Sequence, residues 1–247
     1  MATLPVDCKR RLIRDIKEAI DGSLEPHGIY YAHDETDMLT GYAMIVGQEG
    51  TPYYGGYYFF TFRFLSSYPY VPPIVKFDTR CGNYRFHPNL YSNGEVCLSI
   101  LNTWGGGDPW SSCQTISTIL LTICMIMDDS PLLHEPGITL HQPSLNEYNQ
   151  IVEYINIGGA INHVIRKKMH RPFFDTFRPQ ILTHFLKNYD NIVVIIKKRL
   201  KSKDGHKILQ NGYYKMCIVT DYVNLLREFK LIKTEVSLEN NKITSSL

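Results

Sequence analysis

The sequence predicts an α+β domain in which strands come first and helices follow. Between residues 39 and 77, β-forming residues are interrupted by turns, whereas from residue 116 onward apolar residues recur at helical spacing. This segregated order is typical of α+β proteins. With 247 residues, 44% of them hydrophobic, the chain suffices for one large domain or for a medium domain with an appendage.

The N-terminal part is predicted to contain one helix and then strands. Residues 6–20 place Leu12, Ile13, Ile16 and Ile20 on one face and basic residues elsewhere, which indicates an amphipathic helix. Strands are expected at 39–46 and 56–65, and residues 74–77 are expected to form the fourth and last strand of the sheet. Pro- and Gly-rich turns at 52–56 and 68–73 separate them.

The remainder is predicted to be a long irregular segment followed by helices. Residues 78–112 are rich in Gly, Asn and Pro, and so long a loop is usually functional. Apolar stripes then predict helices at 116–127, 145–155, 181–200 and 214–232, with a polar, frayed tail from Leu238. A break at Arg171-Pro172 divides the chain into a core domain, 1–170, and a C-terminal helical extension, 171–247.

Composition excludes several classes of protein. A net charge of +2 does not favour nucleic acid or a membrane surface as a partner. The six cysteines are scattered without a C-x-x-C pair, which argues against a structural metal site and a disulfide scaffold. The N-terminus has no apolar signal core, and the longest apolar stretch, 119–127, is too short to span a bilayer. We therefore expect an intracellular protein, cytoplasmic or nuclear.

The stretch HPNLYSNGEVC, residues 87–97, carries the candidate chemistry. A thiol on an accessible loop, Cys97, can act as a nucleophile. A nearby amide, Asn89, can donate a hydrogen bond to the oxyanion of a tetrahedral intermediate, and loss of such a donor typically costs ~10²–10³-fold in rate. This pair favours acyl or thioester transfer. A papain-like hydrolase is disfavoured because the residues around Cys97 lack that family's signature.

An ordered series of motifs resembles the ubiquitin-conjugating enzymes. Tyr68-Pro-Tyr-Val-Pro-Pro73 is similar to the family's Y-P-x-x-P-P turn, and His87-Pro-Asn89 to its H-P-N motif. The spacing to Cys97 matches the active cysteine, and Trp110-Ser111 matches its W-S dipeptide. The resemblance covers roughly residues 5–170, and the stretch from Cys97 to Gly137 resembles a large, atypical class. That class includes the conjugating domain of BRUCE (Apollon) and the conjugating enzyme served by the second ubiquitin-activating enzyme.

This resemblance implies a fold and an activity. The fold is the UBC fold, a four-stranded antiparallel meander packed against helices, with a C-terminal helical extension. The activity is that of a cysteine-thioester transferase, in which Cys97 accepts ubiquitin from an activating enzyme and passes it to a substrate lysine or a ligase. Asn89 would stabilise the oxyanion or hold the loop, and His87 would support the loop. No metal or organic cofactor is implied.

The resemblance also implies partner surfaces, with departures from the common pattern. The N-terminal basic face, Lys9, Arg10 and Arg11, corresponds to the docking site for the activating enzyme. The common acidic, lysine-orienting residue falls at His134, and Glu135 could also serve.

The ligase-docking patch would comprise Phe64, Ser112 and Cys113, with Ser112 replacing the usual proline. The insertion Gly105–Pro109 carries three glycines and suggests a mobile flap. Two alternatives stay open: a non-catalytic ubiquitin-binding variant of the fold, and conjugation of another modifier such as a SUMO- or NEDD8-like protein.

Overall fold

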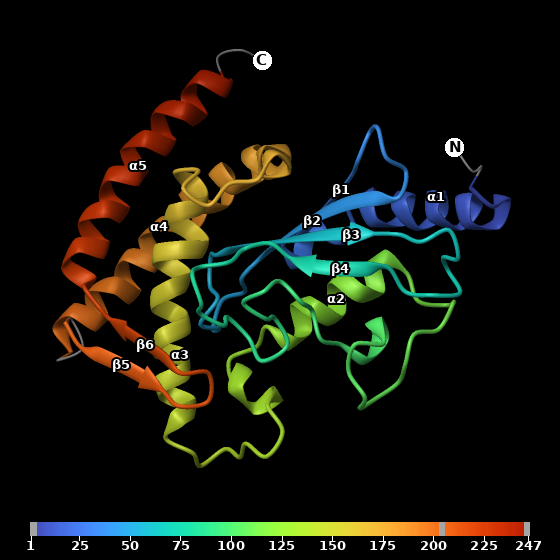
Figure 1. The fold of residues 1–247 in the computed structure, drawn as a ribbon. Helices are drawn as coiled ribbons and strands as arrows, with labels where there is room; N and C mark the ends of the chain where they lie inside the picture. Colours follow the sequence, from blue (N-terminus) through green and yellow to red (C-terminus); the bar gives the residue numbers. More distant parts are fainter. Residues whose placement is uncertain (1–3, 203–205, 245–247) are drawn as a thin grey trace.

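A computed structural model, which describes residues 4–202 and 206–244, confirms the α+β fold and its four-stranded antiparallel meander. The strands follow one another in the sheet in chain order (Figure 1). Ala43 faces Phe60 and Phe60 faces Phe77 across neighbouring strands, so one face of the sheet carries contiguous apolar side chains. The strands are β1 (Ile29–His33), β2 (Thr40–Val46), β3 (Tyr57–Arg63) and β4 (Ile74–Phe77).

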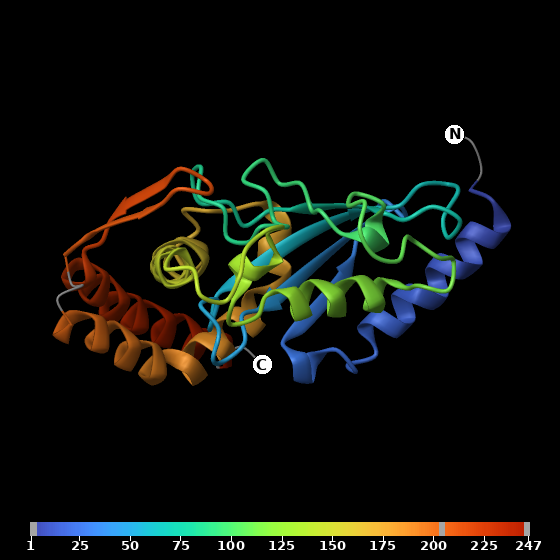
Figure 2. The ribbon, with the colours of Figure 1, turned by 90° about the horizontal axis from the view of Figure 1, so that it is seen from below.

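Two helices cover this face of the sheet. Helix α1 (Val6–Ile20) and helix α2 (Ile116–Ile126) lie side by side under the strands in Figure 2. Their apolar stripes pack with the aromatic side chains of β3 in one buried cluster, which explains the helical periodicity of both segments. The long loop between β4 and α2 runs along the edge of this layer and carries the candidate cysteine.

The C-terminal helices cover the opposite face of the same sheet. Met44, Val46, Tyr57 and Phe59 point away from α2 and pack against residues 157–236. The Phe59 ring stacks on Phe174 with centroids 3.7 Å apart. Since both faces are covered, β2 and β3 read as almost continuous apolar runs. These helices are the π-helical segment Asn156–His163, α4 (Arg178–Lys201) and α5 (Tyr222–Thr244). Helix α3 (Ser144–Ile155), which the π-helical segment continues, places its buried side chains in the first cluster instead.

The structure corrects three expectations. The sequence pattern does not predict the first strand, β1. The predicted helix at 214–232 begins only at Tyr222, because β5 (Ile208–Asn211) and β6 (Met216–Val219) form a hairpin ahead of it. The tail predicted to fray from Leu238 continues as helix to Thr244, and Glu239 accepts hydrogen bonds from Arg178 at 2.6 and 2.8 Å.

No helix within 4–202 and 206–244 is both long and apolar enough to cross a bilayer.

Candidate active site

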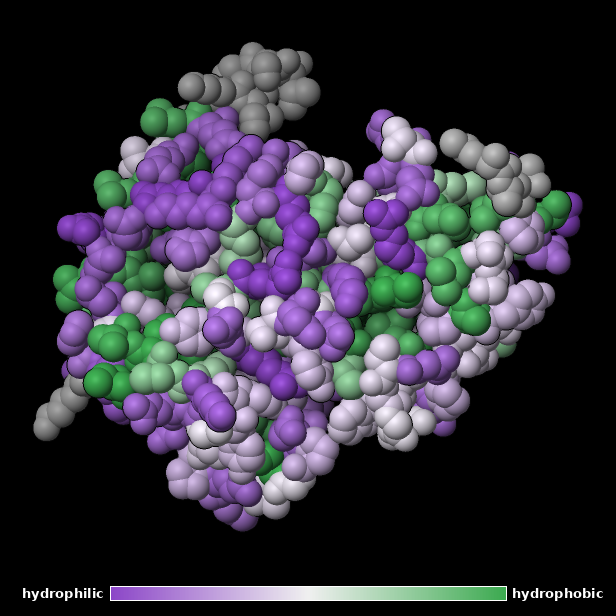
Figure 3. Space-filling model, viewed as in Figure 1, coloured by the Kyte–Doolittle hydropathy of each residue, from purple (hydrophilic) through white to green (hydrophobic). Residues whose placement is uncertain are grey.

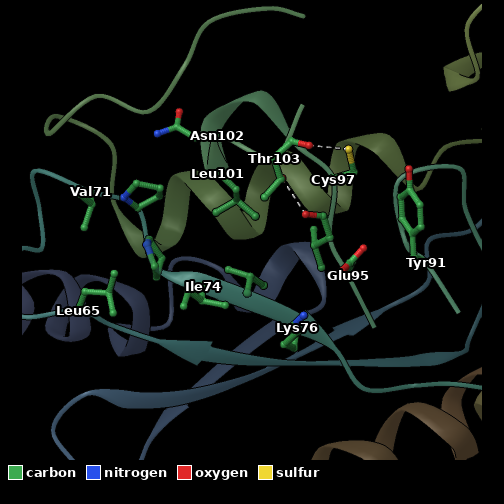
Figure 4. Close-up of a pocket in the computed structure, with 14 residues that line it drawn as sticks. Leu65, Val71, Ile74, Lys76, Tyr91, Glu95, Cys97, Leu101, Asn102 and Thr103 are labelled. Atoms are coloured by element: carbon green, nitrogen blue, oxygen red, sulfur yellow. Dashed lines mark hydrogen bonds between the residues drawn. The ribbon is translucent and has the colours of Figure 1, made fainter. Parts of the chain in front are cut away.

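Cys97 lies in an open groove of about 660 Å³ beside β4. Figure 4 shows β4 forming one side of the groove, with Cys97 and Thr103 on the other. Hydrophobic residues gather in this hollow in Figure 3. The groove is mostly apolar, and Lys76 and Glu95 add one charge of each sign to its lining. Its apolar lining is Leu65, Val71, Pro72, Pro73, Ile74, Val75, Val96 and Leu101.

The cysteine loop is folded around Thr103. The Cys97 thiol donates to the Thr103 carbonyl at 3.0 Å. The Thr103 hydroxyl accepts from the Leu98 amide at 2.9 Å and donates to the Val96 carbonyl at 2.8 Å. One side chain therefore satisfies backbone groups on both sides of the thiol. Sequence reasoning did not assign Thr103 this role, because the contact depends on how the loop turns back.

Burial is the main influence on the Cys97 thiol. It raises the pKa of Cys97 above its ordinary value, whereas the Tyr91 hydroxyl and the Arg85 guanidinium lower it and Glu95 raises it further. The thiol is therefore predominantly protonated at neutral pH, and its attack on an acyl group requires deprotonation when the reacting partner arrives.

Asn89 holds the cysteine loop through its side chain and its backbone. Its amide Nδ2 donates to the Cys97 carbonyl at 2.6 Å, and the Cys97 amide donates to the Asn89 carbonyl at 2.9 Å. The side chain is thus engaged with the backbone of the very residue that reacts.

His87 is fully buried beneath the same loop. Its Nδ1 accepts from the Asn89 amide at 2.9 Å. Burial holds the pKa of His87 well below its ordinary value, and the neighbouring His134 adds to this effect. A neutral imidazole that accepts a backbone hydrogen bond has the geometry expected of a loop support.

The two candidates for orienting a lysine are engaged elsewhere. His134 Nε2 lies 2.9 Å from Asp128 Oδ2, and its ring lies 4.9 Å from the His87 ring. The Glu135 carboxylate accepts a hydrogen bond from the Tyr214 hydroxyl. Neither residue lines the groove at Cys97, where Glu95 contributes a carboxylate.

The candidate ligase-docking residues differ in exposure. Ser112 and Cys113 are exposed. Phe64 is 3% exposed and packs edge-to-face on Tyr68 with centroids 5.2 Å apart, so its ring belongs to the core. The neighbouring Leu65 is 44% exposed and presents the apolar surface at this position.

Lys9 and Arg10 project from α1 into solvent, whereas Arg11 is engaged within the fold. Arg11 Nε donates to both Asp15 oxygens at 2.7 Å, and its guanidinium donates to the Ser112 and Gln114 carbonyls. Arg11 therefore joins α1 to the loop that precedes α2.

The insertion Gly105–Pro109 lies on the surface between two anchored points. The Trp110 amide donates to Asn102 Oδ1 at 3.0 Å, and the Trp110 indole donates to the Pro69 carbonyl at 2.7 Å.

All six cysteines are free, and the described residues contain no cluster of three or more His, Cys, Asp or Glu side chains suited to a metal ion.

Comparison with known proteins gives a consistent family. A family model described as "Ubiquitin-conjugating enzyme" matches residues 11–154. Human "Ubiquitin-conjugating enzyme E2 Z" is 35% identical over 232 residues, which cover 93% of this chain and 64% of that protein. The Xenopus tropicalis protein of the same name is 33% identical over 240 residues, 96% of this chain and 74% of that protein. Arabidopsis thaliana "Probable ubiquitin-conjugating enzyme E2 26" is 42% identical over 130 residues, 51% of this chain and 22% of that protein.

The chain spans just under two thirds of the human relative's length. The likeness to the conjugating domain of BRUCE stays a prediction, since these matches do not test it.

Proposed function

Since this chain belongs to the ubiquitin-conjugating enzyme family, we propose that it carries ubiquitin as a thioester on Cys97. The observation that carries this proposal is the Cys97 thiol at the end of an apolar groove, on a loop fixed by Asn89 and Thr103. The Cys97 thiolate attacks the thioester carbonyl on the activating enzyme, whose cysteine leaves as thiolate. A lysine amine or a ligase cysteine then attacks the new thioester, and Cys97 leaves in turn.

Asn89 is proposed to act by holding the backbone of the cysteine loop in its observed conformation. Its Nδ2 already donates to the Cys97 carbonyl, so the amide would have to give up that hydrogen bond before it could donate to an oxyanion. His87 supports the loop from below as a neutral imidazole. The lysine-orienting role remains proposed for His134 or Glu135, although Glu95 is the carboxylate within the groove.

Ubiquitin, an activating enzyme, a ligase and a protein substrate are the proposed partners. Lys9 and Arg10 offer exposed positive charge to the activating enzyme, and Arg11 fixes the loop beside them. Ser112 and Cys113, with the region of Phe64, are proposed to meet the ligase. We further propose a conjugating core at 1–170, an extension at 171–247, and an intracellular setting in cytoplasm or nucleus.

A charging assay tests the function. The protein is mixed with ubiquitin, ATP and either of the two ubiquitin-activating enzymes, and products are separated on a non-reducing gel. We expect an adduct heavier by one ubiquitin that reductant removes. Cys97→Ala should abolish it, whereas Cys217→Ser, which changes an exposed cysteine outside the groove, should not. If the wild-type protein forms no adduct with either enzyme, the same assay with SUMO- and NEDD8-type systems separates a different modifier from a non-catalytic binder.

A further inference from the structure

The C-terminal hairpin β5–β6 packs against the segment that leads into the H-P-N motif. The Tyr84 hydroxyl donates to the Cys217 carbonyl at 3.1 Å, and the Arg85 amide points at the Met216 sulfur at 3.4 Å. Met216 is 3% exposed and belongs to the same buried cluster as the residues of the sheet and α2. The hairpin thus contacts the chain two residues before His87.

Within this contact, the Arg85 guanidinium lies between two tyrosine rings. It is 3.6 Å from the Tyr91 centroid and 4.4 Å from the Tyr214 centroid. A planar guanidinium between two aromatic faces is held by both rings. The same guanidinium donates to the Pro88 carbonyl, inside the H-P-N motif. Tyr91 in turn lines the groove with Cys97, as Figure 4 shows.

Tyr214 has further contacts that fix its own position. Its hydroxyl donates to Glu135, and its ring lies edge-to-face with Tyr148 at 5.9 Å. The Tyr148 hydroxyl donates to the Arg85 carbonyl at 2.9 Å. Tyr214, which lies in the turn between β5 and β6, therefore connects the loop after α2, helix α3 and the cation beside the cysteine loop.

We infer that Tyr214 is a positioning residue for the chemistry at Cys97: it clamps Arg85 against Tyr91, and so fixes a positive charge and one wall of the groove beside the thiol. The C-terminal segment thereby completes the thioester site. This inference rests on the proposed function for its effect on ubiquitin transfer. Without the Tyr214 ring, one face of the guanidinium is open to water, and a long, flexible side chain can turn away from the groove.

Two readouts on the full chain test this role. The first is the pH dependence of iodoacetamide alkylation at Cys97, resolved by peptide mass spectrometry, with the exposed Cys113 in the same digest as a reference for the reagent. The second is single-turnover discharge of the thioester to free lysine. The variants are Tyr214→Leu, Tyr214→Phe, Arg85→Gln and the matched control Tyr213→Leu, whose side chain is 47% exposed in the same turn.

The Arg85 guanidinium lowers the pKa of Cys97, so Tyr214→Leu and Arg85→Gln, which displace or remove it, should move the alkylation profile to higher pH. We also expect discharge to slow about tenfold, because one wall of the groove loses its fixed position. Tyr214→Phe, which keeps the ring, should restore the profile, and Tyr213→Leu should match the wild type. A variant that combines Tyr214→Leu with Arg85→Gln should discharge its thioester no more slowly than Arg85→Gln alone, because both changes remove the same interaction.

An alkylation profile for Tyr214→Leu that coincides with that of Tyr213→Leu overturns the inference. If Tyr214→Leu fails to fold, as judged by circular dichroism, an unshifted profile for Arg85→Gln overturns it instead. Alkylation needs no ubiquitin. A wild-type protein that forms no thioester therefore refutes the proposed function, while the alkylation profiles still decide the role of Tyr214.

Discussion

Replacement of Thr103 by valine removes one hydroxyl and almost no volume. The hydroxyl accepts from the Leu98 amide at 2.9 Å and donates to the Val96 carbonyl at 2.8 Å, so both backbone groups lose their partner. A typical hydrogen bond contributes about 1 kcal/mol, and because this loop is partly open to water we take that figure for each, or about 2 kcal/mol in total. For a chain of 247 residues this corresponds to a melting temperature lower by about 4 °C.

Differential scanning fluorimetry and the charging rate measure the two consequences. Thr103→Val should melt about 4 °C lower and should charge more slowly, since the Cys97 thiol loses a fixed loop. Thr103→Ser keeps the hydroxyl and should recover most of both. If Thr103→Val melts and charges like the wild type, or if Thr103→Ser is equally impaired, the hydroxyl does not hold the loop.

Three further predictions follow from charges inside the fold. Because burial raises the pKa of Cys97, its alkylation rate should still be increasing at pH 9, and a plateau below pH 8 would contradict this. Asp15 is fully buried with Arg11 and Tyr68 as partners, so Asp15→Ala should lower the free energy of unfolding in urea by about 3 kcal/mol; a loss below about 1 kcal/mol would contradict it. Burial also lowers the pKa of several histidines, so the unfolded chain binds more protons and stability should fall as the pH drops from about 7 to 5. Equal urea midpoints at the two pH values would refute this. These histidines are His33, His87, His163 and His184.

The sequence predicted those elements whose pattern is local. Helices α1 and α2 show apolar residues at helical spacing, because each buries one stripe against the sheet. The helix predicted at 214–232 includes strand β6, because Val219, Val223 and Leu226 also fit a helical period, whereas no element is predicted for β5. Strand β1 is short, and its pairing with β2 is a contact across the turn between them that composition does not reveal.

The same distinction between local patterns and distant contacts applies to the residues of the candidate site. Cys97, Asn89 and His87 lie within eleven residues of one another, so a motif and its spacing suffice to find them. Thr103 and Tyr214 act through contacts that depend on how a loop returns and on where a hairpin docks 117 residues after Cys97. Exposure is likewise a property of packing, which is why Phe64 proved to be buried although its place in the chain suggested a surface anchor.

The coverage of the sheet on both faces has a consequence for how this protein can be shortened. Removal of residues 171–247 would take away most of the helical side chains that cover Met44, Val46, Tyr57 and Phe59, a row of large apolar side chains on two adjacent strands. An exposed apolar strip favours self-association, so a loss of activity in the truncated chain would reveal little about the chemical role of its C-terminal part. Point changes at single contacts are the means of separating what that part does for the reaction from what it does for solubility.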